Sequence, residues 1–506
     1  MKLGVTPIKR IHEILTPWLH SAPQTTALRD PVSGVITYSA LASAIDSAEA
    51  ILQKNGVNAG DRVVVLTENS VATIAFVFAA SRLDAWAVPI NARLTPAEVI
   101  RIVEHATPRA VVCTVDVSQD AKTTGELLNA TPFKGPFGEV TIAWPHDSCP
   151  EPVTDDQVAI VLYTTGTTGA PKGVMMTHAN LLYTCKASSQ SRGITPQDKV
   201  YLALPMSHIF GLASSMFATL YAGGSLTIES RFSAERLLKA IADGITVLPA
   251  VPQMHALLMK HADEKGTPQL VNTKLRQVSS GAAPLDRTWK RKAEKFYGLA
   301  LQNGYGMTET TAGICTTQSE KGDPDISVGL PFPGVEVQLD TDGESEVGEI
   351  LVKGPNVMKG YYRQPEETRK TITENGWLRT GDLGQFDQHG RLHIAGRSKE
   401  LIIRSGFNVF PLEVEAALNT HPKVVQSAVI GRSVEGANED VIAFVQVTQT
   451  GAVSEDELKA HAAEVLTNYK RPSRIILSES LPTAPSGKIL KHKLHGITLP
   501  EPLTNS

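Results

Sequence analysis

The stretch from Tyr163 to Gly173 reads YTTGTTGAPKG and combines four threonines, three glycines and one lysine. Glycine permits positive φ and close approach of the backbone, so successive N–H groups of such a loop can point into one anion-binding concavity. The glycines are Gly166, Gly169 and Gly173, and the hydroxyl groups beside them belong to Thr164, Thr165, Thr167 and Thr168. Lys172 adds a movable positive charge. These residue types predict a loop that binds phosphate groups.

This loop differs from the Walker A pattern GxxxxGK[ST]. Its spacing is different, Ala170 and Pro171 precede Lys172, and Gly173 stands where Walker A has Ser or Thr. The sequence therefore indicates a phosphate loop of another kind. A Gly/Thr-rich surface loop without a ligand is the alternative, and the loop alone does not decide between the two.

Two later stretches carry the other groups that a nucleotide site requires. Residues 303–310 read NGYGMTET, in which the ring of Tyr305 could stack on a base and the carboxylate of Glu309 could hold Mg²⁺ against phosphates. Asp382, in RTGDL, is the type of group that accepts hydrogen bonds from both ribose hydroxyls. The alternatives without function are a tight turn with a solvated glutamate and an ordinary aspartate in a turn. His208 lies in the apolar stretch LPMSHIFG, where a lone histidine is usually part of a core.

The elements that must position these groups alternate between strand-like and helix-like patterns. Apolar runs of strand length lie at residues 62–66, 86–90, 110–113, 158–162 and 245–248, and helix-like stretches such as 96–104 lie between such runs. Ser233 can cap a helix whose apolar residues at 234, 237, 238 and 241 share one face. This alternation is typical of βαβ units and predicts an α/β fold with a large, multi-layer N-terminal domain.

The pattern changes after about residue 395. Three strand-like runs follow, at 424–430, 441–447 and 474–477, and a capping box, Ser454-x-x-Glu457, opens a helix between the last two. We therefore predict a small α+β lid domain at the C-terminal end.

Composition limits the possible partners and the cellular setting. With 506 residues, 42% hydrophobic content and a net charge of −4, the chain is long enough for at least two domains and is not basic enough to bind nucleic acid or an anionic membrane non-specifically. The scattered cysteines, Cys113, Cys149, Cys185 and Cys315, indicate neither a disulfide framework nor a zinc site. We expect a cytoplasmic protein without a membrane span, and the sequence leaves a homodimer open.

Seven stretches together resemble, in order and spacing, the adenylate-forming superfamily of acyl-CoA synthetases, adenylation domains and beetle luciferases. They are YTTGTTGAPKG from 163, LPMSHIFG from 204, SSGAAPL from 279, NGYGMTET from 303, RTGDL from 379, GRSKELIIRSGFNVFPLEVE from 396 and PSGKILK from 485. They span most of the chain, and its total length resembles that of a free-standing acyl-CoA synthetase. The resemblance implies a domain of residues 1–396, a mobile domain of residues 400–506, and a hinge near 397–399.

The resemblance also implies roles for the matched residues. The loop from Thr164 to Gly169, with Lys172, would wrap the phosphates of ATP, Glu309 would help bind Mg²⁺, and Asp382 would hold the ribose. Gly281, Ala282, Ala283, Pro284 and Tyr305 would flank the adenine, and Gly306 and Thr308 would belong to the same cofactor-binding set. Arg397 would contact ribose or phosphate. Lysines and arginines at such positions are otherwise ordinary surface residues.

The remaining implied roles concern catalysis and coenzyme A. His208 belongs to the implied catalytic set, Lys399 stands at the implied hinge, and Lys488 would be the adenylation lysine. A lysine that bridges the acid carboxylate and the α-phosphate offsets the repulsion between two anions and stabilises the transition state. Gly406 would lie beside the pantetheine tunnel, although Ser405 stands where many members carry a second glycine.

The function that follows from this resemblance is an AMP-forming acid–CoA ligase with ATP, Mg²⁺ and CoA as cofactors. One alternative is a free-standing adenylation enzyme that loads a carrier protein, since it shares all the nucleotide motifs. Another is an inactive acyl-sensing homologue. The presence of Lys172, Glu309, Asp382, Arg397 and Lys488 together argues against the inactive homologue.

Most residues of the acid pocket that the resemblance implies are small or apolar. The pocket would be lined near 208–211, 251–254, 279–281, 304–307 and 312–314. Such a lining favours an aliphatic or aromatic monocarboxylate, because a dicarboxylate requires a buried cation to offset its second charge. Arg231 and His255 are the nearby candidates for such a cation.

Overall fold

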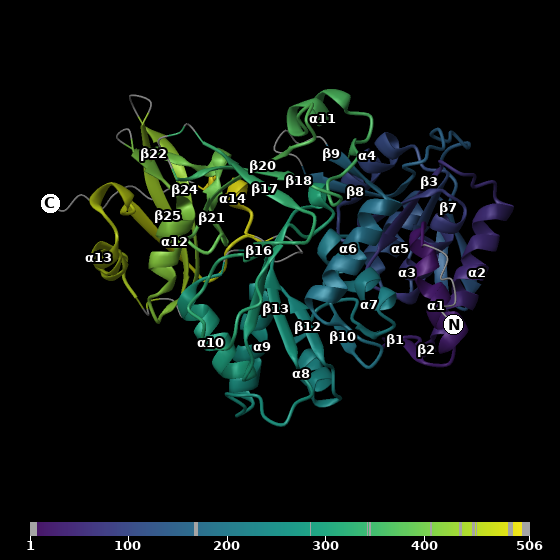
Figure 1. Ribbon diagram of the computed structural model, residues 1–506, viewed down its shortest axis with the longest axis horizontal. Helices are drawn as coiled ribbons and strands as arrows, with labels where there is room; N and C mark the ends of the chain where they lie inside the picture. Colours follow the sequence, from purple (N-terminus) through teal and green to yellow (C-terminus); the bar gives the residue numbers. More distant parts are fainter. Residues whose placement is uncertain are drawn as a thin grey trace.

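The computed structural model describes residues 8–165, 171–283, 285–341, 343, 346–404, 407–434, 438–447, 451, 453–483 and 489–497. These residues form a mixed α/β structure with a large N-terminal domain and a smaller C-terminal domain, as Figure 1 shows. The predicted fold class is therefore confirmed. Within those ranges, no helix has the length and apolar character needed to cross a membrane.

An eight-stranded sheet in the large domain carries the predicted phosphate loop. Its order is β19-β9-β8-β4-β3-β5-β7-β6. In that order the strands are β19 (Gly360–Tyr361), β9 (Pro171–Thr177), β8 (Val158–Thr165), β4 (Trp86–Asn91), β3 (Arg62–Thr67), β5 (Ala110–Cys113), β7 (Gly138–Ala143) and β6 (Thr131–Gly135). The strands predicted near 62–66, 86–90 and 110–113 are confirmed. The strand expected to end at residue 162 continues to Thr165, because β9 pairs with it in antiparallel register.

A nine-stranded sheet forms the second framework of the large domain, in the order β16-β15-β14-β13-β12-β10-β11-β1-β2. In that order the strands are β16 (Leu330–Pro331), β15 (Cys315–Thr316), β14 (Leu301–Tyr305), β13 (Gln277–Gly281), β12 (Val247–Ala250), β10 (Lys199–Leu202), β11 (Ser225–Ile228), β1 (Thr26–Asp30) and β2 (Gly34–Thr37). Neighbouring strands from β14 to β1 run parallel. The carboxyl ends of β13 and β14 therefore meet at one edge, where ligands of open α/β sheets bind.

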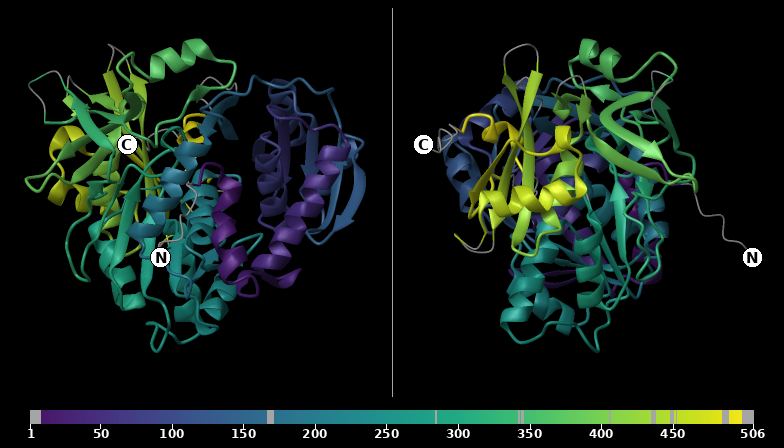
Figure 2. Two further views of the ribbon diagram at one scale, coloured as in Figure 1. Left: turned by 45° about the vertical axis from the view of Figure 1, so that its right-hand side comes forward. Right: turned by 90° about the vertical axis from the view of Figure 1, so that its left-hand side faces the viewer.

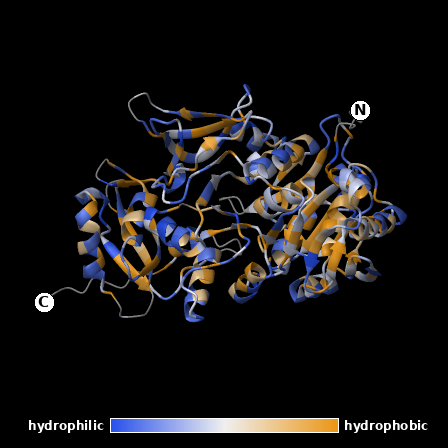
Figure 3. Cartoon of the chain, turned by 60° about the horizontal axis from the view of Figure 1, so that its bottom comes forward, coloured by the Kyte–Doolittle hydropathy of each residue, from blue (hydrophilic) through white to orange (hydrophobic). Residues whose placement is uncertain are grey.

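Helices lie between the two sheets and on their outer faces. They are α1 (Thr16–Ser21), α2 (Tyr38–Lys54), α3 (Val71–Arg82), α4 (Pro96–Ala106), α5 (Gln119–Leu127), α6 (His178–Ser191), α7 (Ala218–Tyr221), α8 (Ala234–Ala242), α9 (Pro252–Glu264), α10 (Arg287–Tyr297) and α11 (Pro365–Thr371). α3 is buried along almost its whole length against β3, β4 and β7, as expected of a helix that is apolar on every side. In Figure 3 hydrophobic colouring is concentrated in the strands and inner helices of this domain.

A second layer of helices lies between the two sheets and packs on the nine-stranded sheet. A π-helix, η2 (Phe210–Phe217), and α7 lie against β10 and β11. The ring of Phe78 in α3 lies 5.5 Å from the ring of Phe217 in η2, so the two layers pack directly on each other. On the outer side, Ser233 caps α8 by accepting a hydrogen bond from the backbone N–H of Arg236 at 3.3 Å, which confirms the predicted cap.

A four-stranded antiparallel sheet connects the large domain to the small one. Its strands are β17 (Glu336–Asp340), β18 (Gly348–Lys353), β20 (Leu378–Phe386) and β21 (Leu392–Arg397). A single 3-10 turn, η4 (Ser398–Glu400), follows β21. The hinge predicted at 397–399 falls on this turn, and both the hinge and the exact domain boundaries stay predictions.

The small domain pairs helices with two short sheets. Its elements are β22 (Ile402–Arg404), β23 (Phe407–Val409), α12 (Pro411–Asn419), β24 (Val424–Val434), β25 (Asn438–Val447), α13 (Glu455–Val465), β26 (Arg474–Ser478) and α14 (Lys491–Leu494). α12 packs on β24 and α13 on β26, as the right-hand view of Figure 2 illustrates. Ser454 caps α13 by accepting from the N–H of Glu457 at 3.1 Å, which is one of the two hydrogen bonds of the predicted capping box. The three strands predicted here are also present.

Candidate active site

Three motifs that are distant in the sequence meet at Asp382. Tyr305, the last residue of β14, donates a hydrogen bond from its hydroxyl to Oδ2 of Asp382 at 2.7 Å. Arg397, at the end of β21, lies opposite Asp382 in the β20–β21 register and places its Nε 3.0 Å from Oδ1. A carboxylate offers about four lone-pair positions, so Asp382 can accept ribose hydroxyls in addition to these two partners. The carboxylate is thus oriented before any nucleotide is bound.

The electrostatics of this group favour a neutral Tyr305. Burial, followed by the charge of Asp382, raises the pKa of Tyr305 well above its ordinary value. Its hydroxyl is therefore a hydrogen-bond donor at neutral pH. Asp382 is only 6% exposed, whereas the side chain of Arg397 is 49% exposed. The guanidinium is accordingly open to a ligand at the surface, while the carboxylate lies below it.

The residues expected beside adenine lie at the carboxyl ends of β13 and β14. Gly281 is buried and pairs with Gly304, and Ala282 follows it with a φ of +65°. A Cβ on Gly306 would lie 1.4 Å from the carbonyl oxygen of Ala312, so glycine is required there. Ala283 is partly buried and Thr308 is buried. These residues share one edge with Tyr305, and Pro284 lies outside the described residues.

The predicted phosphate loop lies between β8 and β9 in the sequence. Thr164 lies opposite Lys172 and Thr165 opposite Pro171, so the chain reverses between them. Gly166, Thr167, Thr168 and Gly169 lie outside the described residues, and so their predicted phosphate contacts stay predictions. Nζ of Lys172 lies 2.5 Å from Oε2 of Glu367 in α11. The lysine is therefore ion-paired within the protein itself.

Glu309, the residue predicted to bind Mg²⁺, lies in the 3-10 turn η3 (Thr308–Thr310) directly after β14. Its Oε1 accepts a hydrogen bond from the hydroxyl of Tyr361 at 2.9 Å. No cluster of three or more acidic, histidine or cysteine side chains suited to a metal occurs among the described residues. A single carboxylate fits Mg²⁺, which keeps several waters and is held by one or two carboxylates together with substrate phosphates.

Sequence reasoning missed Tyr361 and Glu367. Both belong to a segment in which a two-residue strand, β19, pairs with β9 and is followed by α11. A strand of two residues has no periodicity, and the partners of these side chains are 52 and 195 residues away in the sequence. The pairing of β19 with β9 places Tyr361 at the site, and α11 brings Glu367 to Lys172.

His208 lies between two cavities and is not part of a core. It is exposed, and it precedes the π-helix η2, a rare form of helix that occurs frequently at functional sites. A cavity of about 220 Å³ lies on one side, with Tyr163, Thr164, Glu98 and Arg101 in its wall. On the other side is a cavity of about 10 Å³, lined by Leu204, Pro205, Phe210, Gly211, Val251 and Ala282. His208 thus connects the phosphate hairpin with an apolar recess.

The two cations considered for a second substrate carboxylate are both engaged. Arg231 donates to Glu68 at 2.9 and 3.0 Å and to Asp120 at 3.0 Å. Glu68 is only 2% exposed in its side chain and requires a compensating charge. Arg231 is therefore part of a structural ion-pair group.

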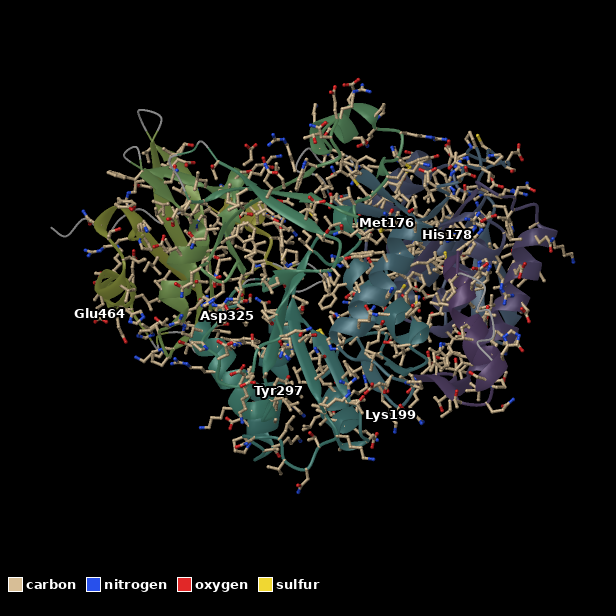
Figure 4. All side chains as sticks on the ribbon, viewed as in Figure 1. Met176, His178, Lys199, Tyr297, Asp325 and Glu464 are labelled. Carbon is tan, nitrogen blue, oxygen red and sulfur yellow. The ribbon has the colours of Figure 1, made fainter. Side chains whose placement is uncertain are left out.

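His255 is fully buried, and both of its ring nitrogens have partners. Nδ1 lies 2.7 Å from the hydroxyl of Tyr297, and Nε2 lies 3.2 Å from the carbonyl oxygen of Ser279. Burial lowers the pKa of His255 to about 4, so the ring is neutral at physiological pH. Tyr297, labelled in Figure 4, ends α10 in the lower part of the large domain. His255 therefore supports the end of β13 and supplies no positive charge.

The small domain meets the large one close to the larger cavity. Lys399 is exposed in η4, and Gly406 and Lys488 lie outside the described residues. Two hydrogen bonds from Thr95 and, more weakly, the charges of Arg101 and of Lys493 in α14 lower the pKa of Glu98, which lines the cavity. Lys493, in the small domain, therefore lies near the cavity wall that includes Glu98.

Comparisons with known proteins cover nearly the whole chain. The family model described as AMP-binding enzyme matches residues 16–362, and the AMP-binding enzyme C-terminal domain matches residues 413–488. The sulfoacetate–CoA ligase of Cupriavidus necator is 33% identical, over 93% of this chain and 94% of the relative.

Solved structures agree with this match. ATP-bound MatB from Rhodopseudomonas palustris is 30% identical with a TM-score of 0.83, over 96% of this chain and 98% of that chain. The O-succinylbenzoate coenzyme A synthetase MenE from Bacillus subtilis, in complex with ATP and magnesium ion, is 29% identical with a TM-score of 0.80, over 95% and 99%.

Proposed function

Because this chain belongs to the AMP-binding enzyme family, we propose that its acid substrate is a small monocarboxylate with an aliphatic or aromatic body. The chain is an AMP-forming acid–CoA ligase that uses ATP, Mg²⁺ and CoA. It converts the acid and ATP to an acyl-adenylate and pyrophosphate, and the thiol of CoA then displaces AMP. The proposal concerns the identity of the acid and the roles of individual residues.

The residues around Asp382 hold the nucleoside in this proposal. Asp382 accepts the ribose hydroxyls, and Tyr305 flanks the adenine while its hydroxyl keeps the carboxylate in place. Residues 281–284 form the other wall of the adenine site. Support comes from the hydrogen bond and ion pair that fix Asp382 and from the shared edge of β13 and β14.

The phosphate end of the site is assigned to the β8–β9 hairpin. Lys172 exchanges the carboxylate of Glu367 for the phosphates of ATP, and Glu309 offers a carboxylate oxygen to the metal. Bound Mg²⁺ would neutralise charge on the phosphates. Lys488 offsets the repulsion between the acid carboxylate and the α-phosphate, a role that matches the approach of the C-terminal segment to the cavity.

The apolar lining of the recess beside His208 is the observation that carries the choice of acid. The recess itself is about 10 Å³, room for one water, so an acid enters it only when these side chains move apart. Its lining is apolar, and neither Arg231 nor His255 offers a charge to it, because Arg231 pairs with acidic side chains and His255 is neutral. A second carboxylate buried there without a cation would be strongly disfavoured. A monocarboxylate with an apolar body is therefore preferred.

A diacid is the second candidate, and Arg192 favours it. This residue donates hydrogen bonds to the carbonyl oxygen and the hydroxyl of Ser214, and it forms no ion pair with any described residue. Burial lowers the pKa of Arg192 to about 10, and its Cζ lies 6.0 Å from the centre of the Phe210 ring, which lines the recess. A partly buried guanidinium without a carboxylate partner among the described residues suits an acid with a distal anionic group, such as the sulfoacetate named for one relative.

The test is a panel of acids with pyrophosphate release and CoA-dependent AMP formation as readouts. Short aliphatic, medium aliphatic, aryl and dicarboxylic acids are compared with the native protein and the Arg192→Met variant. We expect the highest kcat/KM for a monocarboxylate and little change on Arg192→Met. A dicarboxylate preference that Arg192→Met abolishes selectively would establish the second candidate instead.

We also propose a cytoplasmic location. Cys113, Cys185 and Cys315 are buried free thiols, and burial raises the pKa of the Cys113 and Cys315 thiols to about 12. Such thiols suit a reducing compartment. A homodimer stays a prediction that light scattering can decide.

A further inference from the structure

Tyr361 contacts both residues that the phosphate end of the site requires. Its hydroxyl donates to Oε1 of Glu309 at 2.9 Å, and the centre of its ring lies 5.2 Å from Nζ of Lys172. The side chain is 6% exposed. One buried tyrosine therefore lies between the proposed metal carboxylate and the proposed phosphate lysine.

The backbone around Tyr361 explains how it reaches this position. β19 pairs with β9 so that Tyr361 lies opposite Val174, two residues beyond Lys172 on the neighbouring strand. The backbone N–H of Tyr361 donates to the hydroxyl of Thr368 in α11 at 2.9 Å. Gly360 has a φ of +144°, and a Cβ there would lie 2.8 Å from Thr368, so the close approach of α11 depends on glycine. The tyrosine is fixed by backbone pairing on one side and by α11 on the other.

The hydrogen bond to Glu309 and the ring contact with Lys172 leave different groups available to a ligand. Within the described chain, Tyr361 is the one side chain that donates a hydrogen bond to Glu309, and it uses Oε1. The other oxygen, Oε2, has no side-chain donor among the described residues and is available to a cation. The ring stabilises the ammonium of Lys172 through its negative face without adding a formal charge, so it does not compete with phosphates as the carboxylate of Glu367 does.

We propose that Tyr361 is a positioning residue for adenylate formation, which holds the Glu309 carboxylate for Mg²⁺ and the Lys172 ammonium for the phosphates of ATP. The inference rests on the roles proposed above for Glu309 and Lys172. Both of these roles depend on the side chain of Tyr361, and only the first half-reaction, adenylate formation, requires it. Phosphates displace Glu367 from Lys172, while the tyrosine contacts remain.

The chain offers a matched control next to Tyr361. Tyr362 is also buried, and its hydroxyl also donates to a glutamate, Oε1 of Glu151 at 2.7 Å, but Glu151 is not part of the proposed site. Tyr361→Phe and Tyr362→Phe remove the same group from adjacent buried residues. A general effect of losing a buried hydroxyl should appear in both variants.

The experiment measures pyrophosphate release against Mg²⁺ concentration for the native protein, both phenylalanine variants and Glu309→Gln. We expect Tyr361→Phe to raise the half-saturating Mg²⁺ concentration about tenfold, the effect of losing one hydrogen bond to a charged group. Tyr362→Phe should leave it within about twofold of the native value. Thioester formation from supplied acyl-adenylate and CoA should be unchanged in Tyr361→Phe, since that step does not use pyrophosphate or its metal.

The outcomes separate this inference from the proposed function. If Glu309→Gln shifts the Mg²⁺ requirement and Tyr361→Phe does not, the positioning role is overturned while the metal role of Glu309 stands. If Glu309→Gln has no effect, the metal role falls and the inference falls with it. Equal effects of the two phenylalanine variants would also overturn the inference. In the double variant, Tyr361→Phe should add no further shift to Glu309→Gln, because the acceptor charge is already gone.

Discussion

Replacing Asp382 by asparagine tests the centre of the proposed nucleotide site. The carboxylate is nearly buried and accepts from Tyr305 at 2.7 Å while Arg397 pairs with its other oxygen. Asparagine keeps the shape and one acceptor oxygen but removes the charge. We expect ATP to bind more weakly, because each ribose hydroxyl would donate to a neutral acceptor or lose its acceptor.

The size of the effect follows from the kind of bond that is lost. A hydrogen bond to a charged group contributes about 1.5–3 kcal/mol and one between neutral groups about 0.5–1.5 kcal/mol. Two ribose hydroxyls should therefore lose about 2 kcal/mol together, which is roughly a 30-fold increase in the Kd of ATP. The pair with Arg397 adds little, since a half-exposed ion pair contributes about 0–1 kcal/mol.

Calorimetric titration with ATP and with 2′,3′-dideoxy-ATP isolates the ribose contribution. The native protein should bind ATP more tightly than the dideoxy analogue, and Asp382→Asn should remove most of that difference while changing affinity for the analogue little. Asp340→Asn, at an exposed position paired with Arg379, serves as a control that should alter neither. Equal weakening of both nucleotides by Asp382→Asn would show that the residue acts through Tyr305 or Arg397, and would refute the ribose assignment.

Three further predictions concern catalysis, motion and stability. Lys488→Ala should slow adenylate formation by roughly 10² to 10³ and spare thioester formation from supplied adenylate, as measured by rapid quench; equal loss of both steps would contradict its role. Lys399→Pro should keep single-turnover pyrophosphate release but lose thioester formation, because proline fixes φ near −65° at the proposed hinge; normal thioester formation would exclude that hinge. His255 has a folded-state pKa of about 4, below its value of about 6.5 in the unfolded chain, so the unfolded state binds the proton first and stability falls as pH drops from 6.5 towards 4. His255→Gln should remove about 2.5 kcal/mol of the loss in unfolding free energy that denaturant titrations measure between pH 7.5 and pH 4.5, and an unchanged pH dependence would contradict the buried neutral ring.

The sequence predicted those parts of the fold in which local pattern and final environment coincide. β3 and β4 are buried in the interior of a sheet, and such strands read as continuous apolar runs. The caps of α8 and α13 are equally local, since the donor and acceptor are three residues apart. The extension of β8 to Thr165 could not be read in this way, because its polar residues are in the strand only through their pairing with β9.

The sequence predicted which chemical groups form the candidate site but not which of them contact one another. Tyr305 and Asp382 were each recognised from short motifs, yet their hydrogen bond joins residues 77 positions apart. Tyr361 carried no local signal at all, although it touches two of the recognised residues.

Arg231 shows the same limitation for a residue that has suitable chemistry but is engaged elsewhere. Its sequence neighbourhood is compatible with a substrate-binding cation, but the buried carboxylate of Glu68 pairs with both Arg93 and Arg231, so the fold assigns Arg231 to this ion-pair group. Buried charges compete for partners over the whole molecule, and the outcome depends on which of them the tertiary structure desolvates. A motif therefore indicates which chemistry a residue can perform, whereas the desolvated groups around it determine whether that residue is available to perform it.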